Sequence, residues 1–195
     1  MFYKHTRMVH FDTDFKIYCL EAITNEQQKH ISSILPSLEK LALQYGITNI
    51  YQTCDSIESF ESNINNLFYE DRNFHEYEIL YLVFEGAGNQ IKIDNYNYTL
   101  EEIAEFFEGK LKGKQLHFAN TMQLNLDKET AQYFIDVTGA TAVSGYQNQA
   151  PILSSVLDNL FFALCYDDDD VKRITETLYQ KHNTLAKAMG FTLYY

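Results

Sequence analysis

Apolar and polar positions follow two patterns along the chain, short mostly apolar runs and longer segments with apolar residues at helical spacing. The short runs are rich in β-branched and aromatic residues, as is typical of strands buried on both faces. Strands are predicted at residues 15–22, 47–54, 78–84, 114–120 and 140–146. A helical segment follows most of these runs, so strand and helix are expected to alternate.

The predicted helices are located by their apolar spacing and by residues that favour helix ends. The segment 25–46 has leucines and isoleucines near helical spacing and ends at Gly46, and Pro36 is expected to kink or split it. A capping box, Thr99 with Glu102, predicts a helix over 99–113. Further helices are predicted at 56–77, 127–140, 151–166 and 171–189, a hairpin around 94–95, and a possible edge strand at 191–195.

This alternation predicts an α/β fold with three layers, αβα, around a mostly parallel sheet of about five or six strands. We expect one domain over 1–195, with 1–14 as an N-terminal extension and 171–195 as a C-terminal helix and possible edge strand. In such folds ligands gather at the carboxyl ends of the strands. The strand-end residues to inspect are Glu21, Cys54, Glu85, Gly86, Asn120, Thr121, Ser144 and Gly145.

Composition narrows the classes of partner. The formal net charge of -12 and the pI near 4.8 argue against nucleic acid or an anionic membrane surface, and favour a cationic patch on a partner protein. No apolar run approaches the roughly 18 residues that span a bilayer. We therefore expect a cytoplasmic protein whose abundant tyrosines, 15 in all, contribute to a protein or peptide interface.

Neither a metal nor a cofactor is predicted. The three cysteines are far apart, and each lies in an apolar segment, so they are expected to be reduced core thiols. The six histidines show no metal-ligand spacing, and His117 is expected to be a satisfied buried residue. No nucleophile elbow, phosphate-binding loop or dinucleotide fingerprint occurs.

The stretches "LVFEGAG", "TLEEIAEFFEGKLKGK", "LHFANTMQL" and "TGATAVSGY", in this order, resemble the fold of the caspase-like cysteine peptidases over roughly residues 15–165. The likeness is greatest to a bacterial group near the CHAT peptidases. In that family a His-Gly pair closes the third strand, and a cysteine preceded by a small residue closes the fourth. The resemblance implies a caspase-like sheet with its site at these two strand ends.

The chain departs from the family at both catalytic positions. The histidine position falls on Glu85, followed by Gly86, and the cysteine position falls on Thr121, preceded by Asn120. A carboxylate is a weak base, and a threonine hydroxyl is far less acidic than a thiol. The resemblance therefore implies a catalytically inactive homologue, a protein-binding or signalling module in a bacterium.

Two alternatives remain at this point. The first is an active hydrolase with a non-standard dyad, in which Glu85 is the base and Thr121 or Cys54 the nucleophile. The second is a flavodoxin-like domain that senses a small ligand or nucleotide. The candidate binding residues are Glu21, Gly86, Asn120 and Ser144, and in the flavodoxin-like alternative the "EGAG" turn and the "ANT" strand end line the pocket. A homodimer through the C-terminal strand is also expected, since caspases often pair through a terminal strand.

Overall fold

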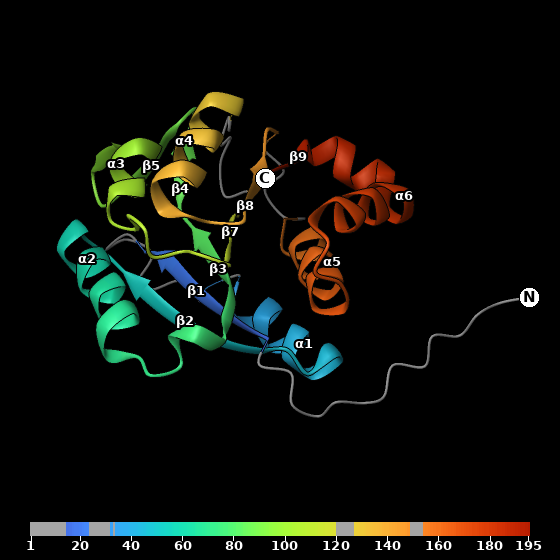
Figure 1. Ribbon diagram of the computed structural model, residues 1–195, viewed down its shortest axis with the longest axis horizontal. Coiled ribbons are helices and arrows are strands. Elements are labelled where there is room, and N and C mark those ends of the chain that lie inside the picture. The colour runs from blue at the N-terminus through green and yellow to red at the C-terminus, as the bar shows by residue number, and fades with distance from the viewer. Residues whose placement is uncertain (1–14, 24–31, 33, 120–126, 149–153) are drawn as a thin grey trace, which may run out of the picture.

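The computed structural model describes residues 15–23, 32, 34–119, 127–148 and 154–195 (Figure 1). Nine strands and eight helical segments lie in these ranges. The strands are β1 Lys16–Ala22, β2 Thr48–Cys54, β3 Tyr77–Val83, β4 Glu85–Ala87, β5 Gln90–Ile93, β6 Tyr96–Thr99, β7 Gln115–Phe118, β8 Ala142–Tyr146 and β9 Phe191–Tyr194. The helices are α1 Leu35–Tyr45, α2 Ile57–Asn65, η2 Asn66–Glu70, η3 Phe74–Glu76, α3 Leu100–Glu105, α4 Lys128–Thr138, α5 Ser154–Asp167 and α6 Val171–Met189.

The main sheet has six strands in the order β2-β1-β3-β7-β8-β9. All neighbouring pairs are parallel except β8 and β9, which are antiparallel. The predicted mostly parallel sheet and the predicted terminal edge strand are confirmed. A second sheet, β4-β5-β6, is antiparallel and follows directly after β3.

Helices cover both faces of the main sheet, as predicted (Figure 1). One core layer packs α2, α3, α4 and the small sheet against the sheet, with Phe60, Phe107 and Phe134 at its centre. The other packs α1, α5 and α6 against the opposite face, with Phe161 and Phe162 at its centre. Strands between two apolar layers bury both faces, which explains why their sequences are continuously apolar.

Local signals explain most helix starts. The Ser56 hydroxyl accepts a hydrogen bond from the Ser59 N–H, and the Thr99 hydroxyl accepts one from the Glu102 N–H, so both N-termini are capped. Asp94 has a φ of 55°, and lies at the turn of the predicted hairpin between β5 and β6. The acidic run ends α5 at Asp167, and the Asp170 carboxylate caps α6.

Two helix boundaries differ from the prediction. Pro36 lies in the first turn of α1, which starts at Leu35, and proline is tolerated there because its missing N–H would have no acceptor within the helix. The helix predicted over 99–113 ends at Glu105 and continues as turns. Much of the predicted helix before Pro36 lies outside the described residues.

Candidate functional site

The ends of β3 and β7 lie side by side at one edge of the sheet. These strands are parallel neighbours that pair Leu82 with Phe118, and the Ala119 N–H donates to the Leu82 carbonyl at 2.9 Å. Glu85 follows the end of β3 by two residues. Asn120 and Thr121 follow β7, but they lie outside the described residues, so a contact between Glu85 and Thr121 stays a prediction.

The structure places Glu85 and Gly86 in β4, where Glu85 pairs with Lys92 across the antiparallel ladder. A Cβ on Gly86 would lie 2.5 Å from the Gln90 carbonyl oxygen, so the hairpin needs glycine here. Gly88 has a φ of 66°, which also favours glycine. The Glu-Gly-Ala-Gly stretch therefore has a structural explanation in the close approach of β4 and β5.

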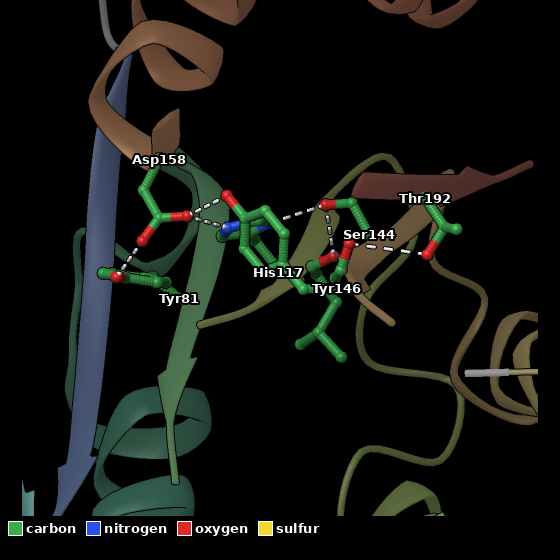
Figure 2. Close-up of polar contacts among 8 residues, drawn as sticks. Tyr81, His117, Ser144, Tyr146, Asp158 and Thr192 are labelled. Carbon is green, nitrogen blue, oxygen red and sulfur yellow. Dashed lines mark hydrogen bonds and ion pairs between the residues drawn. The ribbon is translucent and has the colours of Figure 1, made fainter. Parts of the chain in front are cut away.

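A buried polar network lies between the main sheet and α5, further inside the core than these strand ends (Figure 2). His117 of β7 contacts the Ser144 hydroxyl through Nδ1 at 2.7 Å and the Asp158 carboxylate through Nε2 at 2.8 Å. The hydroxyls of Tyr81 and Tyr146 also donate to Asp158, the first at 2.6 Å. An ionised carboxylate only accepts hydrogen bonds, so all three donors converge on Asp158.

The line Ser144, His117, Asp158 has the residue types of a nucleophile, a base and an orienting acid. However, the three residues are 1%, 0% and 1% exposed. The imidazole is enclosed by the rings of Phe161 and Phe162, with centroids at 5.2 and 5.3 Å. No substrate reaches a hydroxyl enclosed in this way, so the network is structural, and His117 is the satisfied buried residue that was expected.

Burial affects the tyrosines of this network in the same direction. Loss of solvation raises the pKa of Tyr81 and of Tyr146 well above its ordinary value, and the neighbouring charge of Asp158 raises it further. Both phenols therefore stay protonated and act as donors.

Two of the predicted binding residues are occupied by contacts within the chain. The carboxylate of Glu21 in β1 accepts hydrogen bonds from the Tyr51 and Ser32 hydroxyls, each at 2.5 Å. Ser144 lies inside β8, where its hydroxyl contacts His117 and donates to the Leu116 carbonyl at 3.4 Å. The role of Glu21 and Ser144 in binding stays a prediction.

All three cysteines of the chain are buried and form no disulfide. Desolvation raises the pKa of Cys54 to about 12, and the pKa of Cys19 and of Cys165 is raised as well. A thiolate is the nucleophile in cysteine chemistry. None of the three thiols is therefore both exposed and readily ionised, as a catalytic thiol needs to be.

The described residues contain no group of three or more histidine, cysteine, aspartate or glutamate side chains that could hold a metal ion. In the same part of the chain, no helix combines the length and the apolar character that a membrane crossing needs.

Asp158, the shared partner in the buried network, was not predicted from the sequence. The available signal was a single acid inside the apolar segment 151–166, where burial of an unpaired charge would be costly. Such an acid predicts a buried hydrogen-bonding partner, and the three donors supply it.

Comparisons with known proteins agree with the caspase-like architecture. The crystal structure of the Drosophila initiator caspase Dronc superposes with a TM-score of 0.56 at 11% identity, over 93% of this chain and 79% of that one. At this identity the likeness shows the fold alone. No curated protein matches the sequence. The model of one family matches residues 14–195, which is nearly the whole sequence, and the chain therefore belongs to that family, DUF6642, a family of unknown function.

Proposed function

We propose that the chain is a non-catalytic caspase-like protein that binds a protein or peptide partner in a bacterial signalling or defence system. The observation that carries this proposal is the state of the chain's cysteines. The fold of a cysteine peptidase is present, yet all three thiols are buried, and Cys54, the one nearest a strand end, has its pKa raised to about 12. A scaffold without an available thiolate is suited to recognition.

No histidine stands at the position where the resemblance places the catalytic base. Glu85 occupies the position after β3, and His117 lies below the strand ends, fully buried and bonded at both ring nitrogens. A carboxylate is a weak base for a hydroxyl. This weakens the alternative of a hydrolase that uses Glu85 with Thr121 or Cys54.

The binding proposal also draws on the two end strands of the main sheet, each of which pairs with a strand on one side only within the described ranges. β9 is the last strand at one end, and we propose that two copies pair there to form a homodimer. Sedimentation velocity on the full chain tests this part, and a monomer over the whole concentration range refutes it.

Digestion of a proteome-derived peptide library tests the non-catalytic proposal. We expect no cleavage above the buffer background, as measured by mass spectrometry. Cleavage that disappears in Thr121→Ala or in Cys54→Ser would refute it and would assign the nucleophile. An active caspase in a parallel digestion is the positive control.

A further inference from the structure

The outer edge of β2 is an open strand edge. β2 ends the main sheet and pairs with β1 on one side, and within the described ranges no strand pairs with its other side. Its seven residues, TNIYQTC, contain no charge and no proline. Exposed edges usually carry charges, prolines or bulges that prevent pairing, so an uncharged edge of this length is suited to adding a strand.

The hydrogen bonds of β2 show which of its backbone groups point outward. The Cys54 carbonyl accepts from the Ile23 N–H at 2.8 Å, so Cys54 faces β1, and alternate residues face the other way. Asn49, Tyr51 and Thr53 therefore present their N–H and C=O groups at the outer edge. The Thr53 carbonyl already accepts from the Asn63 amide at 3.1 Å. Asn49 and Tyr51 supply the backbone groups for a new ladder.

A groove of about 280 Å³ runs beside this edge, between β2 and the helical segment α2–η2. Buried Tyr18 and Leu67 line it together with Ile50, which is 37% exposed. Its polar lining is Gln52, Asn63, Asn66, Glu70 and Asp71. A second hollow of about 390 Å³ shares Asn66 and Glu70 with it.

All the charged residues that line these two hollows are acidic. Glu58, Glu61, Glu70 and Asp71 line them, and neither lining contains a lysine or an arginine. The Lys110 ammonium lies over the Tyr69 ring, 4.9 Å from its centroid. Together with the net charge of -12, this lining is complementary to a basic ligand.

We propose that the β2 edge and its groove bind an extended basic segment of a partner protein. The segment adds a strand beside β2, and one lysine or arginine enters the groove. Its aliphatic stem packs on Ile50 and Leu67, and its cationic head reaches Glu70 and Asp71. This assignment rests on the proposed function, because it names the surface and the partner chemistry of the binding module.

Fluorescence anisotropy with the full chain tests the site. The probe is a short, capped, labelled peptide in which lysine alternates with valine, and the control peptide has glutamate in place of lysine. We expect saturable binding of the lysine peptide alone. Glu70→Gln should weaken binding about twofold to fivefold. Glu39→Gln, on exposed α1 at the opposite face, makes the same charge change and should leave binding unaltered.

Asn49→Pro tests the backbone ladder, because it removes an outward N–H that β1 does not use. It should weaken binding about tenfold or more. Asn49→Ala is the matched control, since both variants lose the side-chain bond to the Leu38 carbonyl and only proline loses the N–H. Binding that is absent, equal for both peptides, or equal in Asn49→Pro and Asn49→Ala overturns the site.

Two other outcomes are separable. If the lysine peptide dissociates a dimer, the β2 edge is the contact between two copies of the chain, and the proposal is overturned. Cleavage of the peptide during the titration, seen by mass spectrometry, would refute the non-catalytic function and this inference with it. No binding to an intact peptide overturns the β2 site alone and leaves the proposed function standing.

Discussion

Replacing Asp158 with alanine tests whether the buried network holds α5 on the sheet. The carboxylate accepts hydrogen bonds from His117, Tyr81 and Tyr146, and it is 1% exposed. Its removal leaves three buried donors without an acceptor. Leaving a buried donor unsatisfied costs about 1–3 kcal/mol, so the loss of one acceptor shared by three groups should cost about 4 kcal/mol, a large share of the usual 5–15 kcal/mol of stability.

Urea unfolding followed by circular dichroism measures this cost. With a slope near 2 kcal/mol per M, the unfolding midpoint of Asp158→Ala should fall by about 2 M. The matched control is Asp136→Ala, which removes an exposed acid that accepts from Gln132, and it should change stability by less than about 0.5 kcal/mol. Equal midpoints for the two variants would refute a structural role of the network.

A double-mutant cycle measures the interaction between Tyr81 and Asp158 directly. Tyr81→Phe alone removes one donor and should cost about 1 kcal/mol. In the Asp158→Ala background the Tyr81 hydroxyl has lost its acceptor, so the same change should be neutral or stabilising. A cost of the same size in both backgrounds would show that Tyr81 and Asp158 do not interact.

Three further predictions follow from the glycines, the thiols and the phenols. Gly86→Ala should destabilise the chain by about 1–3 kcal/mol, because the new Cβ would contact the Gln90 carbonyl oxygen. Gly88→Ala should destabilise it by about 1–2 kcal/mol, because Gly88 has a positive φ. An unchanged thermal unfolding temperature of Gly86→Ala would contradict this. Ellman's reagent should find no reactive thiol in the native chain at pH 8 and three after unfolding, since burial raises the pKa of Cys54 to about 12; a fast native reaction mapped to Cys54 contradicts it. Because the folded-state pKa values of Cys54, Tyr81 and Tyr146 lie above their ordinary values, the unfolded chain loses these protons first, and stability should fall as pH rises above about 9. The phenolate absorbance should therefore reach its full value only on unfolding; ionisation of all 15 tyrosines before unfolding is the opposing result.

The central strands β3, β7 and β8 were predictable because each lies between two apolar layers. A run such as "EILYLVF" has no polar face, and this property separates a central strand from a surface helix without any structure. Helix starts were predictable where a short-range cap exists, as at Thr99. Helix ends depend on packing against distant elements, which is why the segment after Glu105 was predicted incorrectly.

The candidate site was predictable only in part. The resemblance placed Glu85 after the third strand, and the parallel pairing of β3 and β7 agrees with a shared edge. The network around Asp158 was not predictable, because its hydrogen bonds join residues 77 and 41 positions apart in the chain. Local patterns carry no information about such contacts.

Covalent trapping with a peptidyl electrophile tests the central claim most directly, that no nucleophile with a working base lies at the joined ends of β3 and β7. The full chain is incubated with a panel of peptidyl acyloxymethyl ketones and chloromethyl ketones, and its intact mass is measured. The account predicts an unchanged mass under conditions that label an active caspase completely. A single stoichiometric adduct that maps to Thr121 or Cys54 would contradict it.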